Sequence, residues 1–193
     1  MCIRDSENPE YRQTYWHTCS HVMAQAVKRL WPEVKLAIGP SIKEGWYYDM
    51  DAPFAFTPEH MTEIEAEMRK ICKEKLKLER FELPREEAIK FMEEKGEPYK
   101  VELIQDLPED APISFYKQGE FTDLCAGPHL DSTGRVKGNA IKLLACNAAY
   151  WRGDSNRETL QRIYGIAFPK KDELDAYLQR IEEALSLIHI SEP

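Results

Sequence analysis

The sequence predicts an α+β fold in which an antiparallel sheet packs with helices. Helical patterns dominate the first half of the chain, and strand-like runs separated by turn signals fill most of the second half. A charged helical pattern then predicts a closing helix. At 193 residues, the chain is long enough for one domain of ordinary size or for two small lobes that share a core.

Apolar periodicity and capping residues place the helices. Residues 14–31 carry apolar side chains at helical spacing, and a proline follows them directly. Residues 57–59 offer a threonine N-cap, a proline at the first helical position and an acidic first turn. Another charged helical pattern opens on a proline and ends before Gly96. Helices are therefore expected over residues 14–31, 57–75, 84–95 and 170–184.

Strands are predicted where short apolar and aromatic runs lie between turn signals. The turn residues Gly39-Pro40 and 43–45 bracket the first two runs, and similar punctuation recurs in the second half of the chain. Strands are therefore expected over residues 36–38, 46–50, 78–83, 113–116, 121–124, 140–151 and 160–168.

The composition excludes several classes of protein. A net charge of −8 argues against indiscriminate binding to a phosphate backbone, although the end of a nucleic acid could still enter a locally basic pocket. The five cysteines lie at scattered spacings without a C-x-x-C pair, which argues against a disulfide framework or a zinc ribbon. No apolar run approaches the roughly 20 residues that span a bilayer, and no signal peptide is recognised. A cytoplasmic protein is expected.

Both ends of the chain resemble translated sequencing-adapter sequence rather than native protein. This applies to residues 1–6 and to residues 186–193, which also interrupt the preceding charged helical pattern. We therefore expect one functional domain over residues 7–185, which would be a fragment of a longer protein.

Two pairs of residues carry metal-binding or proton-transfer chemistry. His17 and His21 are four residues apart on the first helix, so they project from one face, opposite its apolar stripe. Cys125 and His129 leave the end of a strand and enter a Gly-Pro turn, which can aim side chains into a site. Together the four residues could bind tetrahedral zinc. The alternative is that the histidines are structural or exposed, and that a buried cysteine lies beside a surface histidine.

Five segments, in this order, carry a resemblance to a known family. The segments are HTCSH at 17–21, LAIGPSIKEGWYYDMD at 36–51, EPYK at 97–100, FTDLCAGPH at 121–129 and AAYWRGDSNRETLQRIYG at 148–165. Over nearly everything from Tyr11 to Leu185, the chain resembles the editing domain of threonyl-tRNA synthetases. This region is the second additional domain, which these enzymes share with alanyl-tRNA synthetases.

The resemblance implies hydrolysis of serine wrongly esterified to threonine tRNA. It implies catalytic roles for His17, His21, Lys100, Cys125 and His129, and substrate binding by Tyr48 and Asp123. The expected partners are the 3′ acceptor end of tRNA(Thr) and the remaining domains of a synthetase that forms a homodimer. ATP-dependent ligation would belong to those other domains, because residues 7–185 carry no signature for it.

Two points stay open at the level of the sequence. No cofactor is favoured, because threonyl-type domains are thought to position water with the lysine; zinc on His17, His21, Cys125 and His129 is the alternative. The competing functions are a non-catalytic module that docks the acceptor end of tRNA, and a freestanding deacylase that edits in trans.

Overall fold

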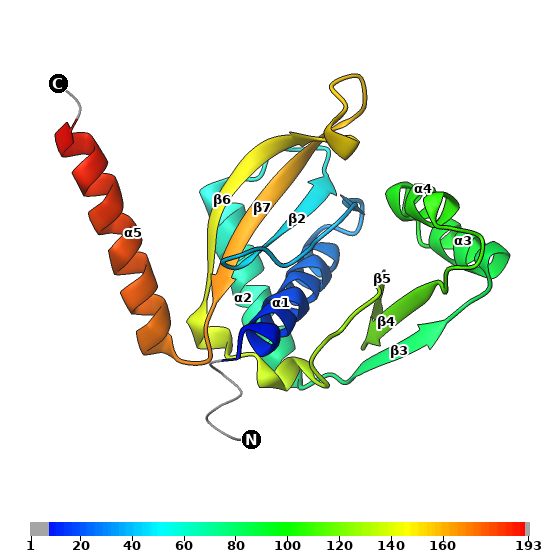
Figure 1. Cartoon of the computed structure of the whole chain (residues 1–193), viewed down its shortest axis with the longest axis horizontal. Coiled ribbons are helices and arrows are strands. Elements are labelled where there is room, and N and C mark those ends of the chain that lie inside the picture. The colour runs from blue at the N-terminus through cyan, green and yellow to red at the C-terminus, as the bar shows by residue number, and fades with distance from the viewer. Residues whose placement is uncertain (1–7, 192–193) are drawn as a thin grey trace.

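The chain folds into two lobes and a projecting helix (Figure 1). A computed structural model describes residues 8–191. The large lobe, as we define it, contains two helices and a four-stranded sheet, and the small lobe contains two helices and a three-stranded sheet. The elements of the large lobe are α1 (Pro9–Leu30), α2 (Pro58–Glu74), β1 (Lys35–Leu36), β2 (Trp46–Asp51), β6 (Ile141–Tyr150) and β7 (Thr159–Ala167).

The core of the large lobe lies between its sheet and its two helices. The strands follow the order β1-β2-β7-β6, and every neighbouring pair is antiparallel. Side chains alternate along β2, so Trp46, Tyr48 and Met50 are buried together on one face. They join apolar residues of α1 and of α2, among them Ile64 and Met68, in one continuous cluster.

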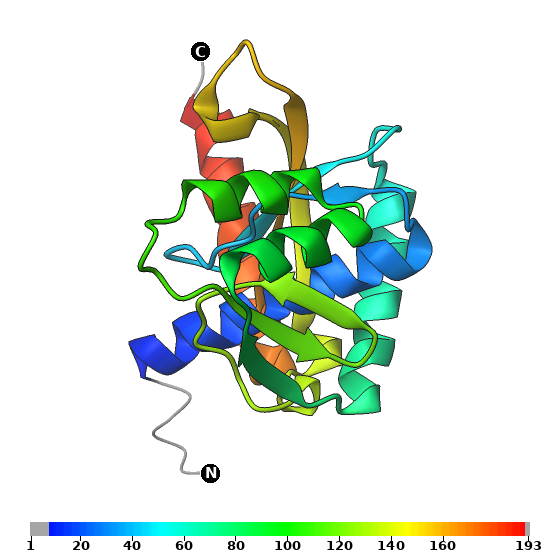
Figure 2. The same ribbon diagram turned by 90° about the vertical axis from the view of Figure 1, so that its right-hand side faces the viewer.

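The small lobe has a separate core between its sheet and its helices (Figure 2). Its elements are β3 (Leu78–Glu82), β4 (Ser114–Gln118), β5 (Phe121–Leu124), α3 (Arg85–Glu94) and α4 (Pro98–Asp106), with strand order β3-β4-β5. Met92, Ile104 and Phe115 are buried in this core. Along β5 the faces alternate, so Phe121 and Asp123 are buried on the face opposite Leu124.

Polar contacts join the two lobes along the second half of α1. Lys28 Nζ lies 2.7 Å from Glu97 Oε1, and the Leu36 amide donates to Glu97 Oε2 at 2.8 Å. One turn away, Gln118 Nε2 donates to Gln25 Oε1 at 2.7 Å. Glu97 immediately precedes α4, so these contacts fix the start of that helix against the large lobe.

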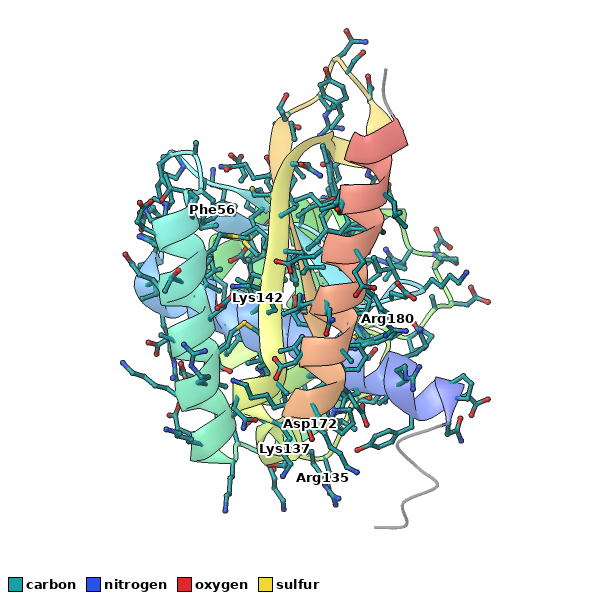
Figure 3. All side chains as sticks on the ribbon, turned by 90° about the vertical axis from the view of Figure 1, so that its left-hand side faces the viewer. Phe56, Arg135, Lys137, Lys142, Asp172 and Arg180 are labelled. Atoms are coloured by element: carbon teal, nitrogen blue, oxygen red, sulfur yellow. The ribbon has the colours of Figure 1, made fainter. Side chains whose placement is uncertain are left out.

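The last helix, α5 (Lys171–Ser191), leaves the body of the molecule (Figure 1). Its first turns are anchored by the buried Leu174 and by the ring of Tyr177 against Phe168. Figure 3 shows α2 and α5 on either side of β6, with Lys142 between them. Within residues 8–191, no helix has the length and apolar character needed to cross a membrane.

The structure confirms the α+β class and most of the expected elements, with three differences. The first helix begins at Pro9, not at residue 14, because the Asn8 side chain caps it by accepting from the Glu10 amide. The short helix α4 was not predicted. The closing helix continues through Ser191, beyond the expected end at residue 184.

The two adapter-like end segments expected from the sequence lie only partly within the described residues. Residues 1–6 and 192–193 lie outside the described residues. The domain boundaries at residues 7 and 185 stay predictions. The four cysteines within the described part of the chain carry free thiols.

Candidate active site

Two histidines of α1 face the small lobe. His17 is partly buried and His21 is 3% exposed. Because they are one helical turn apart, their rings lie close together, with centroids separated by 5.3 Å. His129, from beyond β5, packs against both, with ring centroids 4.2 Å from His17 and 4.1 Å from His21. The structure therefore brings the two histidines of the first motif next to His129 of the second.

The segment after β5 turns sharply beside these rings. Asp123 and Cys125 are two residues apart, so the extended chain directs both toward the histidines. Gly127 has φ +81°, and a Cβ at this position would overlap the Tyr116 hydroxyl. Only glycine therefore suits the turn that brings His129 back to Cys125.

Four potential metal ligands meet in this cluster. Ligand atoms of His17, His21, Cys125 and His129 all lie within 4.8 Å of one another. Cys125 Sγ is 3.1 Å from His129 Nε2 and 3.4 Å from His17 Nε2. The buried His21 Nδ1 has no hydrogen-bond partner among the described residues. Three imidazoles and a thiol are a donor set that suits tetrahedral zinc, so the residues fit this metal.

A buried polar network lies beside the cluster and links both lobes. Lys100 Nζ is 2.9 Å from Asp123 Oδ1 and donates to the Tyr48 hydroxyl at 2.9 Å. The Tyr48 hydroxyl donates to Asp123 Oδ2 at 2.6 Å. Tyr48 comes from β2, Lys100 from α4 and Asp123 from β5, and their exposed fractions are 0%, 3% and 2%. His21 Nε2 lies 3.6 Å from Asp123 Oδ2 and connects this network to the cluster.

Burial keeps the histidines neutral. Desolvation lowers the pKa of His17 and His129, and it lowers the pKa of His21 well below its ordinary value. Neighbouring histidines oppose a charge on His21 and His129, and Lys100 opposes one on His17 and His21. Burial also raises the pKa of the Cys125 thiol to about 12. At neutral pH the cluster therefore offers uncharged imidazoles and a protonated thiol.

The hydrogen-bond partner of His17 fixes which nitrogen carries its proton. Its Nδ1 lies 3.2 Å from the carbonyl oxygen of Pro128. A carbonyl oxygen only accepts, so Nδ1 must donate, and the lone pair sits on Nε2. That lone pair faces Cys125 and is available to accept a proton.

Two hollows flank the site. A cavity of about 390 Å³ lies between the lobes, with Lys100, Asp123, Gln25 and Phe121 among its lining residues. A wider groove of about 820 Å³ is bordered by His17 and by the Gly127-Pro128 turn. Lys100 and Asp123 therefore line the first hollow, and His17 lines the second.

All seven residues that the sequence singled out lie in this one region. Their roles stay predictions, but the structure brings His17, His21, Tyr48, Lys100, Asp123, Cys125 and His129 together. Sequence reasoning missed Thr18, whose hydroxyl contacts His129, and Glu97, which holds the start of α4. Glu97 carried a signal only as part of the EPYK segment, and Thr18 carried none beyond its place between the histidines.

Comparison of the sequence with known proteins gives a family match over the part of the chain that contains three of the site residues. Residues 113–164, which contain Asp123, Cys125 and His129, match the family described as Threonyl and Alanyl tRNA synthetase second additional domain. The chain is 64% identical to the threonine–tRNA ligase of Clostridium kluyveri over 183 residues, which are 95% of this chain and 28% of that protein. It is 68% identical over 173 residues to the enzyme of Clostridium botulinum strain Hall, covering 90% and 27% of the two chains.

A third relative gives the same coverage. The threonine–tRNA ligase of Clostridium acetobutylicum is 62% identical over 183 residues, again 95% of this chain and 28% of the relative. The chain therefore spans less than a third of the length of these relatives. It belongs to the threonyl-tRNA synthetases, as the segment that carries their second additional domain.

Proposed function

We propose that this domain hydrolyses the ester between serine and threonine tRNA, and so removes the wrong amino acid. The observation that carries the proposal is the Tyr48–Lys100–Asp123 network set against three neutral imidazoles. Ester hydrolysis needs a base for the attacking water and a cation for the developing oxyanion, and the two halves of the site offer these groups.

His17 is the proposed base. Its Nε2 lone pair is oriented by the Nδ1 hydrogen bond to Pro128, and its lowered pKa keeps it neutral at pH 7. It accepts a proton from water as the water oxygen adds to the ester carbonyl carbon. The tetrahedral intermediate then collapses, the bond to the ribose oxygen breaks, and that oxygen takes the proton that His17 accepted from water.

Lys100 is the proposed electrophilic group. An ammonium has three N–H donors, and Lys100 uses two of them on Tyr48 and Asp123. The third donor is left for the oxyanion or for the leaving ribose oxygen. Because the lysine is held by two short contacts inside a buried site, it needs no reorganisation when the charge develops.

Substrate selection is assigned to Asp123 and to the walls around it. Each carboxylate oxygen accepts one hydrogen bond within the network and has a further lone pair for the α-ammonium group of the amino acid. A close wall would exclude the additional methyl of threonine. One methyl discriminates by only about 1–3 kcal/mol in a synthetic pocket, so a second, smaller site completes the selection.

We favour a reaction without metal, in which Lys100 replaces a metal as the source of positive charge. In the alternative reaction, His17, His21, Cys125 and His129 would hold zinc, which would lower the pKa of a bound water. Metal analysis after mild purification separates the two: stoichiometric zinc that disappears in a His17→Ala variant would refute the metal-free reaction.

The wider setting of the domain is also proposed. The full-length protein would ligate threonine to tRNA with ATP in other domains, act as a homodimer in the cytoplasm and deliver the 3′ end of tRNA(Thr) to this site. Support comes from the threonine–tRNA ligases that the chain resembles.

The test compares deacylation of seryl-tRNA(Thr) and threonyl-tRNA(Thr) at high protein concentration. We expect preferential loss of serine, which His17→Ala and Lys100→Met abolish. Lys90→Met is the matched control, because Lys90 is exposed on α3 and outside the site. A folded protein that binds the tRNA end but hydrolyses neither ester would instead support a non-catalytic docking module.

A further inference from the structure

Thr18 links α1 to the segment that follows the Gly127-Pro128 turn through hydrogen bonds of its side-chain hydroxyl. It is fully buried, at 0% exposure. Its Oγ1 lies 3.0 Å from the Thr14 carbonyl oxygen, 3.1 Å from His129 Nδ1 and 3.0 Å from the Leu130 amide nitrogen. The hydroxyl thus has three hydrogen-bond partners, and the fixed roles of two of them limit which group donates in each bond.

The Leu130 amide can only donate, and the Thr14 carbonyl can only accept. Thr18 has a single hydroxyl proton, which leaves two arrangements. In the first, Thr18 donates to the Thr14 carbonyl, so His129 Nδ1 must carry a proton and donate to Thr18. In the second, Thr18 donates to His129 Nδ1, and the ring proton moves to Nε2, facing Cys125 Sγ at 3.1 Å.

The chemistry of sulfur favours the first arrangement. The second arrangement lacks the O–H···O bond from Thr18 to the Thr14 carbonyl and has instead an N–H···S bond from His129 to Cys125. Sulfur is a weak acceptor, so this exchange is unfavourable. Thr14 O can accept both its helical bond and the hydroxyl, because a carbonyl oxygen has two lone pairs. The cysteine sulfur already accepts from the Gly127 amide at 3.2 Å, which further reduces what a second donor would add.

The arrangements differ in what they leave for catalysis. In the first, His17 and His129 both present an Nε2 lone pair to Cys125, whose single S–H can donate to only one of them. One imidazole lone pair therefore stays available for a water proton. In the second, the S–H donates to His17, and neither lone pair is available.

We propose that Thr18 is a positioning residue that holds His129 in its Nδ1–H tautomer and so keeps one imidazole lone pair available for the attacking water. The contribution to rate rests on the proposed deacylase function, whereas the tautomer itself does not.

The test is ¹⁵N NMR of histidine-labelled protein at neutral pH, with His129 assigned by comparison with a His129→Gln variant. Wild-type protein should show a protonated Nδ1 and an unprotonated Nε2. In Thr18→Val, which is nearly isosteric but lacks the hydroxyl, the proton should move to Nε2, and Thr18→Ser should restore the wild-type pattern. A wild-type spectrum with the His129 proton on Nε2 overturns the proposal, and this result does not depend on how the Thr18 variants fold.

Kinetics supply the second readout. We expect Thr18→Val to lower kcat for seryl-tRNA(Thr) by at least about tenfold with little change in KM, since a positioned base contributes roughly 10²–10⁴-fold. Thr18→Ser should recover most of the rate. A Thr18→Val protein that loses activity but keeps the Nδ1–H tautomer would reduce Thr18 to a packing residue. Wild-type protein without deacylase activity would refute the proposed function, and the tautomer would still be read from the spectrum.

Discussion

Replacing Lys100 by methionine should destabilise the protein as well as inactivate it. The substitution keeps most of the length and the apolar character of the side-chain stem and removes the ammonium that lies 2.9 Å from Asp123 Oδ1. Asp123 is 2% exposed and then keeps, among the described residues, only the Tyr48 hydroxyl and the nearby His21 as polar partners. Removing one partner of a buried ion pair costs about 3–5 kcal/mol, mostly because the other charge stays buried. This is a large part of the roughly 5–15 kcal/mol that holds a domain folded.

The double variant Lys100→Met/Asp123→Asn tests this reasoning. Asparagine removes the buried charge and still accepts from the Tyr48 hydroxyl, so the double variant should be more stable than Lys100→Met alone. We expect a coupling energy of about 2–3 kcal/mol, in the upper part of the range for residues in contact. Urea unfolding followed by tryptophan fluorescence measures Lys100→Met, Asp123→Asn and the double variant, with the exposed Lys90→Met as the control that should change stability by less than about 0.5 kcal/mol.

One outcome would refute the argument. If Asp123→Asn adds its own full cost to that of Lys100→Met, the pair is not an ionic unit, and solvent must reach Asp123. Neither the single nor the double variant should hydrolyse seryl-tRNA(Thr), so activity cannot substitute for the stability measurement. The comparison also decides whether an inactive Lys100→Met protein reports on catalysis or on unfolding.

Three further perturbations test other contacts of the structure. The hydrogen bond from Arg29 lowers the pKa of Glu120 to about 2 from 4.5, so it stabilises the protein above about pH 4.5 and the benefit is lost as the pH falls toward 2. Glu120 is largely exposed, so Glu120→Gln should cost only about 0.5–1 kcal/mol at pH 7, and a difference that stays constant from pH 7 to pH 3 in urea titrations would contradict this assignment. Gly127→Ala should lower stability by about 1–3 kcal/mol, since it combines a positive φ with an overlap on Tyr116; an unchanged thermal midpoint would mean that the turn has another conformation. Tyr48→Phe removes a hydroxyl that both donates and accepts in the buried network, so it should cost about 1–3 kcal/mol in urea unfolding, and wild-type stability would exclude the network in solution.

Local patterns in the sequence predict most of this fold. The capped helix beginning after Thr57 and the strand Phe121–Leu124 lie where they are expected, because caps, proline placement and apolar alternation act over a few residues. The helix α4 escaped prediction because it is short and its first buried side chains are Tyr99 and Lys100, which do not form an apolar stripe. Its helical state depends on docking between the lobes, which no local pattern encodes.

The candidate site likewise contains residues that local sequence patterns predict and one that they do not. Spacing alone predicts that His17 and His21 share a face and that Cys125 and His129 leave one turn. By contrast, only the family resemblance points to Lys100. Lysine next to a predicted helix is ordinarily exposed, and its burial follows from how α4 meets β2 and β5. Long-range placement of this kind lies beyond arguments from periodicity.

The contacts between the lobes explain how a site of this kind keeps its geometry. An apolar interface tolerates small sliding movements, because burial depends on area and has no direction. Hydrogen bonds and ion pairs, by contrast, weaken steeply when their distance or angle changes. Glu97 contacts Lys28 and the Leu36 amide, and Gln118 contacts Gln25. These contacts therefore define one position of the small lobe relative to the large lobe. The buried network depends on this position, because Lys100 belongs to one lobe and Tyr48 to the other, with 2.9 Å between their polar atoms. Buried charge pairs contribute little net stability, so we attribute the presence of Lys100 and Asp123 here to the placement of the groups proposed to act on the ester.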